Sequence, residues 1–211
     1  KKIMKIDIKN KTNDLNEKLK KNFSKNKETL NKVKENLGKK IKSISENNDN
    51  FSRVKENIEK KIKNFFDWVK GAELVELEKC DTTDDPVRPE LSNEFRTSFG
   101  RKIYGVKYQG EIHAVMCFAF TNEIPKSVIE LEQYSKDTFL QSAQRDQNVG
   151  KIAIAYTVWS KKRGGGKLIV KEVFKKIKKS NHLNRLVTLS PLTEMATKFH
   201  TRNGAKLLQI N

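Results

Sequence analysis

An apolar strand that runs into a basic, triple-glycine turn constrains this chain more than any other feature. Residues 151–159 read Lys-Ile-Ala-Ile-Ala-Tyr-Thr-Val-Trp, which predicts a buried strand, and residues 167–179 place apolar side chains at helical spacing. Between them stands Lys161-Lys162-Arg163-Gly164-Gly165-Gly166. Glycine lets the main chain approach a ligand closely, and the first N–H groups of a helix lack internal partners and lie at the positive end of its dipole. The pattern predicts a phosphate-binding turn, with Lys167 and Lys171 adding positive charge beside it.

This turn has two other interpretations. A nucleoside-triphosphate loop needs a glycine at Lys161 and a hydroxyl side chain after the lysine, where Leu168 stands, so it is excluded. A tight connecting turn without a ligand stays open. Three successive glycines cost backbone entropy, which favours a ligand-binding role over a simple connection.

The periodicity of residues 72–211 predicts an α/β arrangement. Residues 72–78 alternate like a strand, and residues 101–108 and 111–120 form a predicted hairpin around Gln109-Gly110. Further predicted elements are a polar, partly helical segment at 124–145, a strand at 185–189, a helix with Leu192, Met195, Ala196 and Phe199 on one face, and a strand at 206–210. Strands and helices thus interleave along the chain.

Residues 12–70 read as a long amphipathic helical segment. Apolar side chains recur three or four residues apart, with lysine, glutamate and asparagine between them. The run Asn47-Asn48-Asp49-Asn50 interrupts the stripe, Ser52 is a candidate cap for a second helix, and Gly71 ends the segment. One apolar stripe needs a partner, so we expect helix packing, self-association or an assembly partner through residues 12–70. A membrane-surface helix is the rival interpretation.

Charge and apolar runs limit the class of protein. The chain has 44 Lys+Arg against 26 Asp+Glu, and residues 1–70 hold 21 basic and 10 acidic side chains. This excess predicts nonspecific, salt-dependent contact with nucleic acid or another anionic surface, with a solubilising charged face as the alternative. No apolar run is long enough to span a bilayer, and no signal-peptide core is present. Cys80 and Cys117 show no metal or redox spacing, which predicts reduced, structural thiols.

Residues 72–211 resemble the GNAT superfamily of acyl-CoA-dependent N-acetyltransferases. Lys161-Lys162-Arg163-Gly164-Gly165-Gly166 stands where that family has Arg/Gln-x-x-Gly-x-Gly/Ala, with Lys161 replacing Arg or Gln. Downstream, the family's late helix pattern is matched in spacing by Thr193, Ala196, Phe199, His200, Gly204 and Ala205. The resemblance implies a GNAT-like mixed sheet with flanking helices over residues 71–211, lacking its last strand after Asn211, behind a helical or coiled-coil extension at 1–70. A compact domain of this kind in a Lys/Asn-rich chain also faintly resembles small GNAT-like proteins encoded by phages.

The resemblance also implies a ligand and a mechanism. Acetyl-CoA or another acyl-CoA is expected, with its phosphates on residues 161–167 and its pantetheine arm on the main chain of Thr157, Val158 and Trp159. An unidentified amine attacks the thioester, and a general acid protonates the leaving thiolate. The family's usual tyrosine acid is replaced by His200, which becomes the candidate acid. A half-exposed structural histidine is the alternative.

The base is less well marked, because strand 151–159 carries no carboxylate. Glu111, His113 and Asp146 are the nearest candidates by predicted position, and Tyr156 is a candidate proton relay. His113 and Tyr156 have packing roles as their alternatives. A missing base would leave a slow enzyme or a binding domain, since general bases contribute roughly 10²–10⁴-fold in rate.

Two functions follow from these observations. The first is an acyl-CoA-dependent N-acetyltransferase whose basic helical segment localises or oligomerises it. The second is a catalytically weak structural component of a larger assembly, a virion or a nucleoprotein particle, anchored by residues 12–70. We expect the enzyme in the cytoplasm and the structural component within the viral or nucleoprotein particle.

Overall fold

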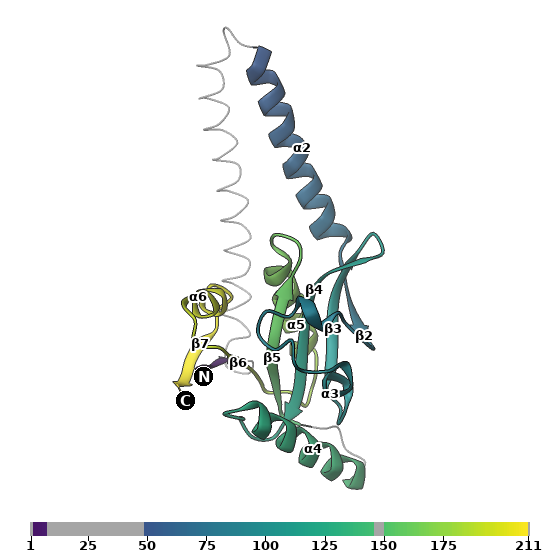
Figure 1. Cartoon of the computed structure of the whole chain (residues 1–211), viewed down its shortest axis with the longest axis vertical. Helices are drawn as coiled ribbons and strands as arrows, with labels where there is room; N and C mark the ends of the chain where they lie inside the picture. The colour runs from purple at the N-terminus through teal and green to yellow at the C-terminus, as the bar shows by residue number, and fades with distance from the viewer. Residues whose placement is uncertain (1, 8–48, 146–149, 211) are drawn as a thin grey trace. The chain divides into compact units, whose positions relative to one another are not determined.

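The computed structural model divides the chain into two units, residues 1–9 with 72–211, and residues 10–71. It describes residues 2–7, 49–145 and 150–210, so most of the predicted helical segment, residues 12–48, lies outside the described residues. Within the second unit, helix α2 spans Asp49–Gly71 (Figure 1). No helix among the described residues is long and apolar enough to cross a membrane.

Helix α2 begins inside the predicted interruption at residues 47–50 and ends at Gly71, as expected. It begins before Ser52, so Ser52 lies within the helix and does not cap it. Its apolar side chains stay about half exposed at Val54, Phe65 and Phe66. The expectation that this stripe packs on a partner stays a prediction.

The first unit is built on one mixed, seven-stranded sheet of order β2-β3-β4-β5-β6-β1-β7. All neighbouring pairs are antiparallel except β5 with β6. The strands are β1 Lys2–Asp7, β2 Glu73–Leu77, β3 Lys102–Tyr108, β4 Glu111–Thr121, β5 Ile152–Ser160, β6 Arg185–Ser190 and β7 Lys206–Ile210. The helices are α3 Asn93–Thr97, α4 Val128–Arg145, α5 Gly165–Lys178 and α6 Glu194–Arg202, with a short 3-10 turn at Thr82–Asp84. The predicted α/β class and the hairpin of β3 and β4 are therefore confirmed.

Strand β1 departs from the predicted domain boundary. Residues 1–70 were assigned to a helical extension, whereas Lys2–Asp7 pairs antiparallel with β6 on one side and β7 on the other. Without β1, the edges of β6 and β7 would leave main-chain N–H and C=O groups without partners. A six-residue strand between them satisfies these groups, whichever part of the chain it comes from. The sheet thus continues past β6 with a strand taken from the start of the chain.

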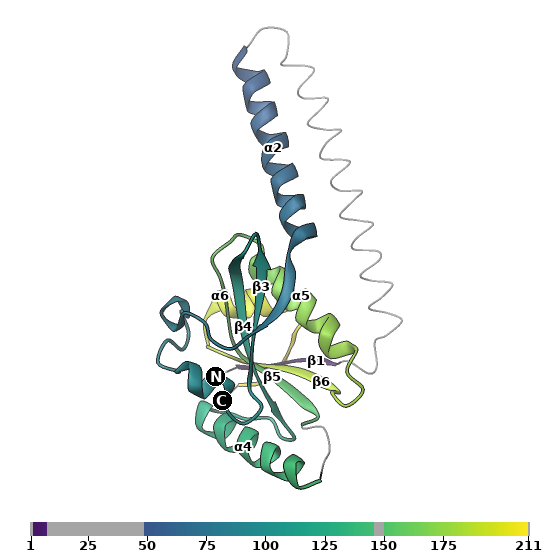
Figure 2. The ribbon, with the colours of Figure 1, turned by 90° about the vertical axis from the view of Figure 1, so that its right-hand side faces the viewer.

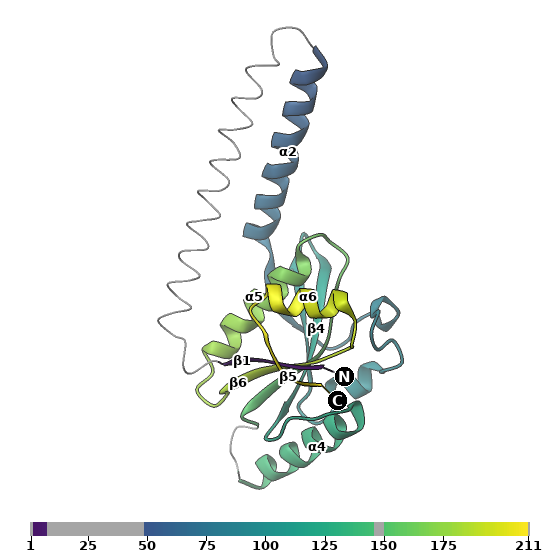
Figure 3. The ribbon, with the colours of Figure 1, turned by 90° about the vertical axis from the view of Figure 1, so that its left-hand side faces the viewer.

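The sheet carries helices on both faces. Figure 3 shows α5 and α6 on one side and α4 on the other, and Figure 2 gives the same layers from the opposite side. Helix α5 buries its apolar stripe, and it begins at Gly165, two residues before the predicted start. The other face holds the main core cluster, in which Leu131 of α4 and Phe95 of α3 pack with Cys117 and Tyr156. These layers leave the edges of β5 and β6 to form the site.

Candidate functional site between strands β5 and β6

Strands β5 and β6 separate halfway along their length. They pair over four residues only, from Ile152↔Arg185 to Ala155↔Thr188. Beyond Ala155, β5 continues to pair with β4, while the end of β6 pairs with β1. The main chain of Thr157–Trp159 therefore has no strand on its β6 side. We call the space between the diverging strands the wedge.

A β-bulge lies where the wedge opens. The register of β5 against β4 shifts between Cys117↔Thr157 and Phe118↔Ala155, which leaves Tyr156 without a cross-strand partner. A bulge re-aims neighbouring side chains and frees main-chain groups. The Tyr156 ring packs in the core, 6.1 Å from the Phe95 ring.

The wedge opens into a cavity of about 440 Å³. Its walls come from β5, the end of β6, the start of α5 and the inner side of α6, and they are mostly apolar. The polar side chains among them are Thr157, Ser160, Thr188, Ser190, Thr193, His200 and Asn203, and no carboxylate or lysine lines the cavity. Thr188 is 8% exposed, and its hydroxyl has no hydrogen-bond partner. A buried hydroxyl of this kind is costly unless a ligand completes it.

The glycine turn forms the mouth of the cavity, and each glycine has a geometric reason. Gly164 is the N-cap of α5 and has φ +86°, which favours glycine. A Cβ on Gly165 would lie 3.1 Å from the Ser160 Cβ, and one on Gly166 would lie 3.1 Å from the Phe199 Cε2. The glycines thus let α5 start close against β5 and α6.

The first turn of α5 offers main-chain donors. The N–H of Gly165 donates to the Lys162 carbonyl and that of Leu168 to the Gly164 carbonyl. In the described part of the chain, the N–H groups of Gly166 and Lys167 meet no acceptor outside the helix. Two donors at a helix start form an anion site of the predicted kind.

Of the predicted cations of the turn, two have a partner within the chain and two are exposed. Lys161 pairs with Asp84 at 2.5 Å, a hydrogen bond that raises the pKa of the lysine, and the Lys162 ammonium lies 4.9 Å from the centre of the Tyr108 ring. Arg163 and Lys167 are exposed. Lys167 also lines a second, open hollow of about 710 Å³ together with Lys198 and Arg202 of α6. Sequence reasoning missed these two, although their spacing of four residues on a predicted helix puts them on one face.

The second hollow is continuous in its lining with the cavity. Met195, Phe199 and Asn203 of α6 line both spaces. Lys198 is partly neutralised by Glu194 at 2.5 Å, which leaves Lys167 and Arg202 as the basic groups of the hollow without a recorded ion pair. A basic, open hollow thus adjoins an apolar, partly enclosed one.

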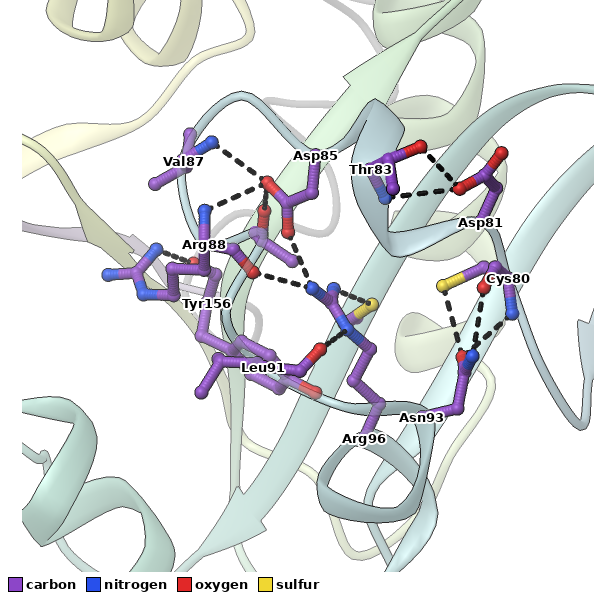
Figure 4. Close-up of polar contacts among 12 residues, drawn as sticks. Cys80, Asp81, Thr83, Asp85, Val87, Arg88, Leu91, Asn93, Arg96 and Tyr156 are labelled. Carbon is purple, nitrogen blue, oxygen red and sulfur yellow. Dashed lines mark hydrogen bonds and ion pairs between the residues drawn. The ribbon is translucent and has the colours of Figure 1, made fainter.

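The far end of the wedge is closed by the loop that follows the 3-10 turn. Asp85, 1% exposed, accepts hydrogen bonds from the Thr157 hydroxyl at 2.7 Å, from the Val87 and Arg88 N–H groups, and from Arg96 at 2.9 Å (Figure 4). Burial raises the pKa of Asp85, but these hydrogen bonds outweigh it and hold the pKa below its ordinary value. The loop is thereby fastened to the bulge of β5.

Arg88 occupies the point where the strands part. Its guanidinium donates from Nη1 to the Tyr156 carbonyl of β5 (Figure 4). Nη2 donates to the Leu189 carbonyl of β6 at 3.1 Å. Because β5 and β6 stop pairing before these residues, neither carbonyl is bound to the opposite strand. Tyr156 and Leu189 both line the cavity. Nothing in the sequence pattern of residues 81–99 marks Arg88, because its partners lie 68 and 101 residues away.

The two cysteines lie behind this loop as free thiols, as expected. Cys117 is fully buried, and burial raises its pKa well above the ordinary value. Cys80 is half-buried, and a hydrogen bond from Cys117, followed by the charge of Arg96, lowers its pKa. No group of three or more His, Cys, Asp or Glu residues that could hold a metal ion occurs within residues 2–7, 49–145 and 150–210.

His200 lies on the cavity wall, but its protonation state differs from the expectation. Burial lowers the pKa of its imidazole to about 4, so the ring is neutral at pH 7. A usable protonated fraction, on which the predicted acid role depended, is therefore absent in this conformation. His200 lines the cavity, and its chemical role stays a prediction.

Of the other catalytic candidates, Glu111 and His113 lie away from the cavity, Asp146 lies outside the described residues, and Tyr156 lines the cavity but buries its hydroxyl in the core. The Glu111 side chain is 80% exposed on the β3–β4 hairpin, with its carboxylate 4.0 Å from His113. Neither residue lines the cavity, and Asp146 lies outside the described residues. The Tyr156 hydroxyl is buried in the core without a partner, and burial raises its pKa well above the ordinary value. A phenol in that state is poorly suited to relay protons at pH 7.

Comparison with known proteins adds a distant structural likeness. No family model matches the chain, and no curated protein matches its sequence. Among solved structures, the chain is similar to the crystal structure of malonyl-CoA decarboxylase from Cupriavidus metallidurans, with 21% sequence identity and a TM-score of 0.43. The match covers 69% of this chain and 37% of that structure.

Proposed function

We propose that the α/β unit binds an acyl-CoA and transfers its acyl group to an amine. The observation that carries this proposal is the wedge, where β5 and β6 part after Ala155 and Thr188 and open into a cavity of about 440 Å³. An anion site at the start of α5, an apolar cavity and a free strand edge follow one another there. This sequence of surfaces suits a molecule with phosphates at one end, an amide-bearing arm and a thioester.

Several unpartnered groups support the fit. The N–H groups of Gly166 and Lys167 offer phosphate donors, and the bare Cα of Gly166 leaves room that a side chain would fill against Phe199. The Thr188 hydroxyl is buried on the cavity wall without a partner. Lys167 and Arg202 add positive charge next to the same donors.

The chain's residues divide the work by position. When bound, the coenzyme supplies the thioester. The start of α5 and Arg202 hold phosphate, the free main-chain edge of Thr157–Trp159 orients the arm, and the apolar walls exclude water. His200 is the one imidazole on the cavity wall, and its neutral ring can pass the proton that leaves the amine to the sulfur, so that amide and thiol form without a net proton change; its pKa of about 4 makes it a weak base for this step.

A second candidate function is acyl-CoA binding without transfer. It is favoured by the lack of any carboxylate among the residues that line the cavity and by the low basicity of an imidazole with a pKa of about 4. In that function the domain would serve as a building block of a larger assembly. Attachment to a virion or a nucleoprotein particle through residues 12–70 stays a prediction.

Calorimetric titration of the full chain with acetyl-CoA and CoA tests the proposal. We expect Gly166→Asp to weaken binding about 10–100-fold, because it adds bulk against Phe199 and negative charge beside the phosphates. Gln133→Asp is the matched control, since it adds the same charge at an exposed position of α4. Thiol release from acetyl-CoA with a panel of primary amines then separates the two functions. Binding without release supports the second candidate, and no binding of either ligand overturns both.

A further inference from the structure

The two cysteines of this chain meet in the core behind the loop that carries Asp85. Leu77, Ile103 and Cys117 stand at one level on β2, β3 and β4, since Leu77 pairs with Ile103 and Ile103 with Cys117. Cys80 follows Leu77 by three residues and packs against the same core cluster as Cys117. The Cys117 thiol donates a hydrogen bond to the Cys80 sulfur. Two sulfurs in this contact need little movement to form a disulfide bond.

The position of Cys80 is fixed through its main chain. Its N–H donates to the Asn93 Oδ1 at 2.8 Å, and its carbonyl accepts from the Asn93 Nδ2 at 2.9 Å (Figure 4). Its thiol lies 3.5 Å from the same Oδ1. Asn93 is the first residue of α3, which Ser92 caps. The start of this helix therefore holds the Cys80 sulfur beside Cys117.

The surroundings make the two thiols unlike each other. Cys80 is half-buried, and the hydrogen bond from Cys117, followed by the charge of Arg96, lowers its pKa against the opposing effect of burial. Cys117 is fully buried, and burial raises its pKa well above the ordinary value. Arg96 also donates from Nη1 to the Cys117 sulfur at 3.3 Å. A partly exposed thiol beside positive charge is the reactive kind of cysteine, whereas a buried thiol is inert on its own.

Core packing accounts for Cys117 but not for the setting of Cys80. Packing needs an apolar side chain of suitable size and no cation beside it. The Cys80 sulfur instead meets an amide oxygen, a thiol donor and the charge of a guanidinium. The chain has no other cysteine, so Cys117 is the one protein thiol that a sulfur bond at Cys80 can reach within the same chain. A reactive thiol next to a second, resolving thiol is the arrangement of a redox-sensitive pair.

We propose that Cys80 and Cys117 form a redox-active pair, which a low-molecular-weight disulfide converts into an internal disulfide bond. The Cys80 thiolate attacks one sulfur of the reagent, so that a mixed disulfide forms and the other reagent sulfur leaves as a thiolate. The Cys117 sulfur then attacks the Cys80 sulfur and displaces the remaining reagent sulfur. Two protein thiols are oxidised, one reagent disulfide is reduced to two thiols, and the two protein protons end on those thiols.

The bond forms at a place that bears on the cavity. Cys117 is the cross-strand partner of Thr157, whose hydroxyl donates to Asp85. Cys80 directly precedes the 3-10 turn and loop that hold Asp85. The disulfide thus fastens the start of this loop to β4, next to the point where the wedge opens. The inference goes beyond the proposed function, because the pair forms whether or not the cavity binds an acyl-CoA.

Oxidation of the wild-type full chain by glutathione disulfide tests the pair without any variant. We expect the chain to lose both free thiols, to keep no glutathione, and to give after digestion a peptide in which Cys80 is joined to Cys117, as read by mass spectrometry. Dithiothreitol should restore both thiols. Thiols that stay free, glutathione that stays attached, or a disulfide that joins two chains would each overturn the inference.

Two matched variants establish which thiol reacts first. In Cys117→Ser, Cys80 has no resolving thiol and should retain one glutathione. In Cys80→Ser, Cys117 should react at least about tenfold more slowly than Cys80 does in Cys117→Ser, because its thiol is buried and little ionised. Labelling of the folded wild type with iodoacetamide gives the same comparison if a variant does not fold, and Cys80 should again be at least about tenfold faster. Equal rates at the two cysteines reject the pair.

Discussion

The two ends of the cavity carry positive charge in opposite ways. At the mouth, Lys167 is exposed beside the start of α5, and Arg202 shares its open hollow. At the closed end, Arg88 is buried and bound to one carbonyl on each side of the wedge. Exposed charges are screened by salt and tolerate many ligand positions, whereas a buried guanidinium acts at one place and strongly. The mouth therefore offers exposed, movable charge, and the closed end holds one guanidinium fixed between two carbonyls.

The largest expected effect lies at the closed end, in Asp85→Asn. This change removes the carboxylate charge of Asp85, the one buried carboxylate among the described residues, and leaves Arg96 and Arg88 buried without it. Loss of one partner of a buried ion pair costs about 3–5 kcal/mol, measured as the free energy of unfolding in urea. Asp81→Asn, an exposed side chain that caps the neighbouring 3-10 turn, is the control and should stay within about 0.5 kcal/mol. Equal effects of the two changes on the free energy of unfolding would mean that the buried Asp85 contributes no more to stability than the exposed Asp81.

A smaller effect is expected from His200, which lies between the two ends. Its pKa is about 4 in the folded chain and about 6.5 when unfolded, so the folded state binds the proton less readily. The stability that this provides is fully present above pH 6.5 and is lost as pH falls towards 4, by up to about 3 kcal/mol. The difference in unfolding free energy between pH 7 and pH 4.5 should therefore be smaller in His200→Phe than in the wild type. Identical differences would mean that the ring is solvated and that the cavity is wetter than its walls suggest.

The smallest effects belong to the mouth. Lys167→Met and Arg202→Met should each weaken CoA binding several-fold at low salt, and should reduce the dependence of affinity on salt, because each removes an exposed charge near the phosphates. Lys175→Met, which removes a lysine paired with Glu172 further along α5, should leave both unchanged. Binding measured by calorimetry at several salt concentrations gives both quantities. A salt dependence that the mouth variants do not alter would place the phosphate contacts elsewhere.

The mouth could be predicted from the sequence and the closed end could not. Gly164–Gly166 follow directly on a strand and open a helix, so local periodicity and glycine content mark the turn. Arg88 and Asp85 lie in an irregular loop, and their contacts with Thr157 and Leu189 span 72 and 101 residues. A pattern read over a window of a few residues contains no information about such contacts.

The sheet shows the same limit. Its hairpin of β3 and β4 was predicted because the two strands are joined by a two-residue turn at Gln109-Gly110. The assignment of Lys2–Asp7 failed because this six-residue segment, with two lysines among three apolar side chains, resembles in composition the basic segment that follows. This segment forms a strand because it pairs with the edges of β6 and β7, which lie nearly 180 residues or more further along the chain.

That origin of β1 has a consequence for the order of events during synthesis. Lys2–Asp7 is made before the other strands of the described sheet, whereas its two neighbours, β6 and β7, are made after the others. Until β6 and β7 are made, β1 has no neighbouring strand to pair with, so the sheet cannot be completed in chain order. A chain begun at residue 72 would contain the glycine turn and the wedge, yet it would expose the edges of β6 and β7, so recombinant work on the α/β unit needs residues 2–7 supplied, in the same polypeptide or as a peptide added in trans.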